Sequence, residues 1–224
     1  MARVNLARRA EIGSAKRART RAAILDAARD RYATTTDGSV TVDAVMQAAG
    51  LAKGTFYVHF KDLADLEAEV GAALVEGANE RLQPARLTVG DPVTRLATAM
   101  TIMLRHLAAQ PARARLAARA AAQIPDVCRA VQARLCEDLA AAQAAGRLVL
   151  PSNDLAARIV LAIVVQAAKD LGLGRIDASA VPDVVRAILR AIGCAPADAA
   201  TRTAQAARRA DNFAQQIAAP RGAD

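Results

Sequence analysis

Residues 41–62, TVDAVMQAAGLAKGTFYVHFKD, constrain the fold of this chain more than any other segment. Thr41 is a good N-cap, and apolar side chains recur after it at helical spacing. Gly50 follows where this helix must reverse direction, and glycine takes a left-handed backbone at low cost. The apolar pattern then restarts at Leu51 and continues to Phe60, so a second short helix packs back on the first. Two short helices joined by a glycine turn are the supersecondary unit of helix-turn-helix DNA readers.

The second helix of this segment leaves a polar face outward. Its apolar positions point inward by spacing, which exposes Lys53, Gly54, Thr55, Tyr57, His59 and Lys61. Ammonium groups, a hydroxyl, a phenol, an imidazole and a glycine that permits close approach all suit phosphates and base edges. A mixed polar face can also be no more than solvated surface, but the glycine turn beside it favours a DNA-reading role.

The residues from Gly50 to Asp62, GLAKGTFYVHFKD, resemble the DNA-binding signature of the TetR family of transcriptional repressors. The family pattern is close to A-G-V-S-x-G-x-x-Y-x-H-F-x-[DN], and the resemblance covers roughly residues 17–70. It implies an N-terminal three-helix helix-turn-helix domain, followed by a C-terminal helical-bundle domain for regulation and dimerisation.

The resemblance also implies a role for each matching side chain. Bases and nearby phosphates would be met at the start of the recognition helix, by Lys53, Gly54 and Thr55. The phosphate backbone would be held by Tyr57, His59 and Lys61. Thr41 would meet a phosphate at the N-terminus of the preceding helix, and helix N-termini attract anions.

Three departures from the family pattern leave the operator sequence unpredictable. Met46 stands where a small alanine is usual, at the crossing of the two helices, so their packing angle can differ. Ala52 replaces the usual serine cap of the recognition helix, which should lose roughly 1 kcal/mol of capping. Thr36 and Asp37 stand where glycine and an aromatic residue are usual, which predicts an irregular first interhelical loop.

Positive charge is concentrated before Asp62. Residues 1–61 carry 11 Lys and Arg against 5 acidic residues, and so supply a net +6 of the total +8. This imbalance is the electrostatic footprint expected of a DNA-binding domain, and an arginine-favouring composition alone does not explain it. Residues 1–16 are expected to form a flexible basic arm, which either contacts DNA or is merely disordered. No apolar core follows its charges, so the arm is not a signal peptide.

The remaining chain predicts helices and no strands, so the fold class is all-α. A supporting helix over residues 17–33 makes residues 17–62 the DNA-binding domain. Residues 63–194 are expected to form the ligand-sensing and dimerisation domain, and residues 195–224 an Ala/Arg-rich helix or tail. Caps and prolines delimit helices at 63–82, 92–109, 111–123, 125–146, 151–171 and 181–192.

Two of these helices suggest a partner surface. Residues 159–165 are apolar all round, so their helix must be covered on both sides, yet the run is too short to span a membrane. Residues 181–192 carry a continuous apolar stripe. Both helices suit a four-helix homodimer interface, which is also where the family dimerises, formed by Ile159, Ile163, Val181, Val184, Val185, Ile188, Leu189 and Ile192. The alternative is that both stripes face only the chain's own core.

By the same resemblance, the second domain should enclose an effector pocket whose occupancy changes the spacing of the two DNA-reading heads. Small and apolar residues dominate this domain, which favours an apolar effector of modest size. The candidate polar contacts are His106, Gln110, Gln123 and Gln166. Residues of these types are more often ordinary surface or hydrogen-bonded side chains.

Catalysis, cofactors and metals find no support in the sequence. His59 and His106 lie in different segments, and no ligand-spaced group of His, Cys and carboxylates exists. Cys128, Cys136 and Cys194 lack CxxC spacing, and without an export signal they fit a reducing cytoplasm.

The sequence thus predicts a cytoplasmic, nucleoid-associated homodimer that binds a double-stranded DNA operator and is no enzyme. It would act as a repressor released by a small-molecule effector. The alternative is a constitutive DNA-binding or architectural protein whose second domain only dimerises. A helical-bundle enzyme with an incidental basic end would need turnover in its support.

Overall fold

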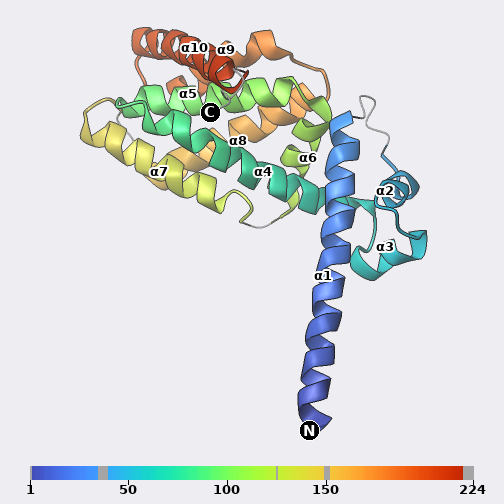
Figure 1. The fold of residues 1–224 in the computed structure, drawn as a ribbon. Helices are drawn as coiled ribbons and strands as arrows, with labels where there is room; N and C mark the ends of the chain where they lie inside the picture. The colour runs from blue at the N-terminus through green and yellow to red at the C-terminus, as the bar shows by residue number, and fades with distance from the viewer. Residues whose placement is uncertain (1, 35–39, 125, 149–151, 219–224) are drawn as a thin grey trace, which may run out of the picture. The chain divides into compact units, whose positions relative to one another are not determined.

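The computed structural model describes residues 2–34, 40–124, 126–148 and 152–218 (Figure 1). Ten α-helices and one 3-10 turn occur in these ranges, and they contain no strand. The all-α prediction is confirmed. The chain divides into two compact units, residues 1–70 and 71–224, each with buried side chains of its own.

The first unit is a small helical domain with an aromatic core. It contains α1 (Ala2–Thr34), α2 (Val42–Ala48), α3 (Lys53–His59) and the first two turns of α4 (Leu63–Leu87). Its fully buried side chains are Ile24, Ala28, Val45, Met46, Phe56, Phe60, Leu66 and Val70. Tyr32 of α1 is also buried, and its hydroxyl donates to Glu67 Oε1 of α4 at 2.6 Å. The buried side of α1 therefore holds α4 as well as α2 and α3.

The structure corrects the expectation of a flexible arm over residues 1–16. Residues 2–16 belong to α1, which continues without a break to Thr34. Ala, Arg, Leu and Glu are strong helix formers, and this stretch contains one glycine, Gly13, and no proline. The side chains of residues 11–19 are exposed. Helix propensity, rather than packing, therefore accounts for the helix at these positions.

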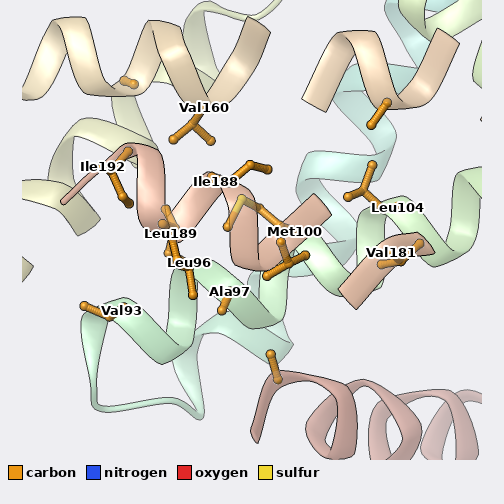
Figure 2. Packing of buried hydrophobic residues seen from close by; sticks show 14 of the residues in the cluster. Val93, Leu96, Ala97, Met100, Leu104, Val160, Val181, Ile188, Leu189 and Ile192 are labelled. Atoms are coloured by element: carbon orange, nitrogen blue, oxygen red, sulfur yellow. The ribbon is translucent and has the colours of Figure 1, made fainter. Parts of the chain in front are cut away.

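The second unit is a helical bundle around α5 and α8. It contains the rest of α4 followed by α5 (Pro92–Ala108), α6 (Pro111–Gln123), α7 (Arg129–Ala144), α8 (Asn153–Gly172), a 3-10 turn (Ala178–Ala180), α9 (Val181–Ala191) and α10 (Pro196–Ala218). In Figure 2, Leu96 and Met100 of α5 meet Ile188 and Leu189 of α9, with Val160 of α8 beside them. These residues form the centre of one continuous apolar core.

Side-chain caps set the starts of two helices in this bundle, and the first is the cap that the Asp91-Pro92 sequence predicts. Asp91 accepts from the Thr94 N–H at 2.8 Å at the start of α5, and Ser152 accepts from the Leu155 N–H at 3.3 Å at the start of α8. The predicted bounds of α5, α6 and α9 agree with the structure to within a residue.

Two predicted helix boundaries are wrong. α4 does not stop before Pro84 but continues to Leu87, because a proline in the last turn removes only one hydrogen bond and its fixed φ suits a helix. α7 begins at Arg129 rather than at residue 125, because Asp126 has a φ of 63°, where a right-handed helix cannot run. Residues 125, 151 and 36–38, on which other predictions fell, lie outside the described ranges.

The C-terminal segment is a packed helix along residues 196–218. α10 lies against α5 and α9 and buries a stripe of small side chains, Ala199, Thr203, Ala206 and Ala210 (Figure 1). Arg202 Nη1 reaches the Asp91 carboxylate at the start of α5, 3.0 Å away. Small side chains let helices approach closely, so an alanine-rich sequence packs here without large apolar residues.

The apolar stripe of α9 faces the chain's own core, which is the alternative that the sequence left open for these residues. Each is at most 1 % exposed: Val181, Val185, Ile188, Leu189 and Ile192. A side chain already covered by α5 and α8 has no surface left for a partner. Ile163 and Val184 are partly buried against the same core, and Ile159 keeps 36 % of its surface exposed.

Two glycines bring α6 into backbone contact with its neighbours. A Cβ at Gly71 of α4 would collide with the carbonyl oxygen of Leu116. A Cβ at Gly172 of α8 would lie 2.6 Å from Arg115 Cγ, and Arg115 Nη1 donates to the Gly172 carbonyl at 2.7 Å. Both contacts need a residue without a side chain, so α6 is held tightly against α4 and against α8.

Candidate DNA interface and ligand cavity

Gly50 closes the turn between α2 and α3. Its φ is 66°, in the left-handed region that the sequence predicted. The Gly50 N–H donates to Gln47 O at 3.1 Å, and the Leu51 N–H donates to Met46 O at 3.0 Å. These bonds end α2 and reverse the chain, while the buried Met46 side chain fills the helix crossing.

Thr41 caps α2, as predicted. Its backbone is extended, and its Oγ1 accepts from the Ala44 N–H at 3.2 Å. The side chain is exposed, and its hydroxyl hydrogen stays available to donate to a phosphate oxygen. Ala52, by contrast, gives α3 no side-chain cap, which agrees with the loss inferred from the sequence.

α3 has one buried and one exposed face. Phe56 is fully buried, and its ring centroid lies 5.3 Å from that of Tyr57 in an edge-on contact and 5.5 Å from that of Phe60. The outer face of the helix carries Lys53, Gly54 and Tyr57 as exposed residues, with Thr55 and His59 half-buried. Lys61, two residues beyond the end of α3, is also exposed. Tyr57 is 58 % exposed although its ring rests on the core. The core therefore fixes the ring while the phenol faces solvent.

The end of α3 is held by a cation–π contact with Arg21 and by hydrogen bonds to two aspartates. The Arg21 guanidinium lies 4.7 Å from the Phe60 ring centroid and pairs with Glu69. Asp62 Oδ1 accepts from the Asp65 N–H at 2.8 Å, and Asp65 Oδ2 accepts from the Lys61 N–H at 3.1 Å. Asp62 therefore caps the start of α4. The two bonds fix the backbone of Lys61 at the corner between α3 and α4.

Lys53 is paired with an acid on the neighbouring helix. Its Nζ lies 2.9 Å from Asp43 Oδ1 and 3.0 Å from Oδ2, although both side chains are largely exposed. The hydrogen bond to Asp43, with the attraction of the same carboxylate, raises the pKa of Lys53. The sequence reasoning placed Lys53 on the DNA face but missed this partner, which lies ten residues earlier on another helix.

Val58 is an exposed apolar residue that the sequence reasoning left out. It is 67 % exposed on the same side of α3 as the polar set. Its position between Tyr57 and His59 was the available signal, because Phe56 and Phe60 account for the buried face. An exposed methyl pair of this kind suits contact with the C5-methyl of thymine.

The second unit encloses an apolar cavity of about 80 Å³ between α4, α5, α6 and α8. Its walls include Leu74, Val75, Met103, Leu107, Ala118, Leu161, Val164 and Val165. A larger hollow of about 440 Å³ adjoins it between α4, α5 and α10, with Phe213 in its wall. Ala78, Arg81, Met103 and His106 line both, so the two spaces meet at these side chains. The larger one falls in the size range of small-molecule sites.

The second unit also has a third internal space and a hollow on its surface. The third, of about 80 Å³, shares Met103, Leu161 and Val164 with the central cavity and is also lined by Asp138. The surface hollow, of about 600 Å³, lies between the start of α5 and α10. Most of the residues that line it are polar or charged, among them Arg202, Arg208 and Arg209.

Two of the four predicted pocket residues lie near the cavity. His106 lines both connected spaces, and Gln110 Nε2 lies 3.4 Å from His106 Nε2. Gln123 and Gln166 belong to none of the cavity linings given above. Gln166 donates instead to Asp170 of its own helix at 2.9 Å.

The sequence of the first unit decides the family. Residues 24–70 match the family model of bacterial regulatory proteins of the tetR family, and the match spans the end of α1 through the start of α4. Residues 24–70 form a TetR-family DNA-binding domain. The chain that carries it is therefore a DNA-binding transcriptional regulator, and TetR-family regulators are not enzymes.

Solved structures share the fold over most of the TetR-family chain. RolR in complex with resorcinol has a TM-score of 0.71 at 23 % identity, covering 85 % of this chain and 95 % of that one. FadR from Bacillus subtilis with stearoyl-CoA has 0.59 at 17 %, covering 74 % and 96 %. NalD, a secondary repressor of a multidrug efflux pump in Pseudomonas aeruginosa, has 0.52 at 18 %, covering 78 % and 98 %. At these identities the likeness shows the fold alone. A comparison with curated protein sequences finds no match.

The described part of this TetR-family chain contains no group of three His, Cys, Asp or Glu residues that could hold a metal ion. Cys128, Cys136 and Cys194 are free thiols, and burial raises the pKa of each. None of the helices in the described ranges is both long and apolar enough to cross a membrane.

Proposed function

We propose that this TetR-family regulator is a homodimeric repressor that a small molecule, bound in the cavity beside α4, releases from its operator. One observation carries the proposal. α4 contributes Leu66 and Val70 to the core of the DNA-reading unit and Leu74, Val75 and Ala78 to the cavity walls. A ligand that presses on the second set acts on the same helix that supports α3.

DNA binding is assigned to the exposed side of α3 and its flanks. Lys53, Gly54, Thr55 and Val58 would meet base edges and nearby phosphates, while Thr41, Tyr57, His59 and Lys61 would hold the phosphate backbone. The support is the exposure of this face and the net +6 of residues 1–61.

Fluorescence anisotropy with an operator selected by the full-length protein from a random DNA library tests this assignment. Lys61→Ala should weaken binding to every sequence and reduce the slope of log K against log salt by about 0.9. Tyr57→Phe keeps the ring that rests on Phe56 and removes only the hydroxyl, so it should weaken binding without unfolding the domain. Arg190→Ala, on the exposed side of α9, is the charge-matched control. Unchanged affinity and salt slope in Lys61→Ala would refute the phosphate assignment.

Release by an effector is tested through thermodynamic linkage. A compound that raises the melting temperature of the full-length protein should weaken operator binding by the same factor by which operator weakens its binding. A compound that binds the cavity and leaves operator affinity unchanged would favour the constitutive DNA-binding protein instead.

Dimerisation is assigned to the outward face of α8, in place of the buried α9 stripe. Leu155 and Ile159 lie one turn apart on this helix and are 50 % and 36 % exposed. Two large apolar side chains on one exposed face are what a self-complementary helix pair would cover.

A further inference from the structure

Three basic or basic-type side chains converge where the two connected spaces of the cavity meet. Arg81 comes from α4, His106 from α5 and Arg113 from α6. Arg81 and His106 line both spaces, and Arg113 lines the inner one. The rest of the inner lining is apolar apart from Cys128, and neither lining includes an Asp or a Glu.

The two arginines lack the carboxylate partners that other arginines of this unit have. Arg81 Nε donates to the Gly77 carbonyl of its own helix at 3.2 Å. Among the residues that the structure describes, no carboxylate pairs with Arg81 or Arg113. Arg105, in the outer wall, is paired with Asp211 at 2.6 Å, and Arg86 is paired with the buried Asp138. Among the arginines that line the two connected spaces, the uncompensated positive charge therefore lies at their junction.

His106 senses this charge. Burial lowers its pKa, and the nearby Arg81 and Arg113 lower it further because a second positive charge beside them is disfavoured. The imidazole is therefore neutral at pH 7 and offers one donor and one acceptor rather than a third cation. Its neighbour Gln110 supplies an amide at 3.4 Å.

We propose that the effector is an amphipathic organic anion, with its apolar body in the cavity and its acidic head between Arg81 and Arg113 beside His106. The inference rests on the proposed function and adds the chemical class of the ligand. Guanidinium groups bind carboxylate, sulfonate and phosphate oxygens through paired, charge-assisted hydrogen bonds. A neutral apolar ligand would leave both guanidiniums without an anionic partner, and a cationic ligand would be repelled.

A matched pair of fluorescent probes tests the head group. Anilinonaphthalene sulfonate and N-phenylnaphthylamine share one aromatic body, and only the first carries an anion. The full-length protein should bind the sulfonate at least about tenfold more tightly, the ratio expected from one charge-assisted hydrogen bond. Octanoate and octyl phosphate should both displace it, whereas octanol and octylammonium should not. Displacement by only one of the two acids identifies which acidic head the site takes.

Arginine variants locate the site. Arg81→Gln and Arg113→Gln should each weaken sulfonate binding several-fold and leave binding of N-phenylnaphthylamine unchanged, which also shows that the cavity remains folded. Arg186→Gln removes the same charge from the exposed side of α9 and should change neither. Equal affinity for both probes, no binding of either, or sulfonate binding that survives both cavity variants would overturn the proposal.

The failure of this inference is distinct from failure of the proposed function. If a neutral compound binds the cavity and releases the operator, the repressor function stands and the anionic class is wrong. If the sulfonate binds through Arg81 and Arg113 but no acid of the series changes operator affinity, the anion site stands and the release mechanism is wrong.

Discussion

Asp43 holds the lysine of the recognition helix in the DNA-free protein. A phosphate that takes up Lys53 must displace a carboxylate 2.9 Å from the ammonium, and that carboxylate then lies near the DNA. Both side chains are largely exposed, so the pair itself adds little to folding stability. If Lys53 contacts DNA as proposed, the effect of the pair falls on DNA binding.

Asp43→Asn should therefore strengthen DNA binding, because it frees Lys53 and removes a negative charge from the interface. The salt slope should steepen by about 0.9 for one added phosphate contact. Fluorescence anisotropy over a salt series measures both quantities. Asp30→Asn, which neutralises an exposed carboxylate of α1, is the control and should have a smaller effect. Equal changes in the two variants would mean that Lys53 is not the group released.

His106 gives a pH readout of the cavity. Its pKa is lowered in the folded protein, so the folded state binds fewer protons than the unfolded chain near the ordinary value of about 6.5. The contribution of His106 to the free energy of unfolding is therefore complete above about pH 6.5, and it is lost as the pH falls through the lowered pKa. NMR titration of the imidazole should show the low value and a rise in Arg113→Gln. A bound acid should raise it too; an unshifted imidazole in the wild type would contradict the positive environment.

Among the helices, α10 shows how small residues form an interface. Ala206 is fully buried between α10 and its neighbours, whereas Ala204, two residues earlier on the same helix, is exposed. The two positions have the same residue type and similar helix propensity, so they differ mainly in packing. Substituting each of the two alanines therefore tests whether α10 packs against the bundle or is an unpacked tail.

Ala206→Leu should destabilise the protein by about 1–3 kcal/mol, because extra methylenes enter a close-packed contact. Ala204→Leu should leave the free energy of unfolding within about 0.5 kcal/mol of the wild type. Urea denaturation of the full-length protein measures both. Similar stability of the two variants would show that α10 is not docked in solution.

At the scale of the whole molecule, dimerisation has to use a surface that the chain's own core does not cover. Ile159→Glu should convert the dimer to monomer, as measured by light scattering, and should reduce affinity for a two-half-site operator far more than for a single half-site. Ala200→Glu places the same charge on the exposed side of α10 and should leave the dimer intact. A dimeric Ile159→Glu protein would rule out this face of α8.

The sequence was most informative where local chemistry decides the structure. The glycine at position 50, the caps at Thr41 and Asp91, and the buried Phe56 and Phe60 each have one low-energy arrangement, and the structure has them. It was least informative where the partner of a helix decides. The stripe of residues 181–192 reads the same whether it faces its own core or a second chain. The uncompensated charge at Arg81 and Arg113 depends on which helices pack together. A local sequence pattern does not show this.

The close contact at Gly71 has a mechanical consequence for α4. At Gly71 no side chain fits between the residues of α6. We therefore expect the contact to hold α4 and α6 close together while resisting rotation of α4 only weakly. The far end of α4 is fastened by Arg86 to Asp138 of α7, and the first residue of the helix lies eight positions before Gly71. At 1.5 Å per residue this arm is about 12 Å long, so a tilt of about 10° would carry its tip about 2 Å. Under the proposed release mechanism, small movements of a cavity wall would therefore become displacements comparable with the length of a hydrogen bond.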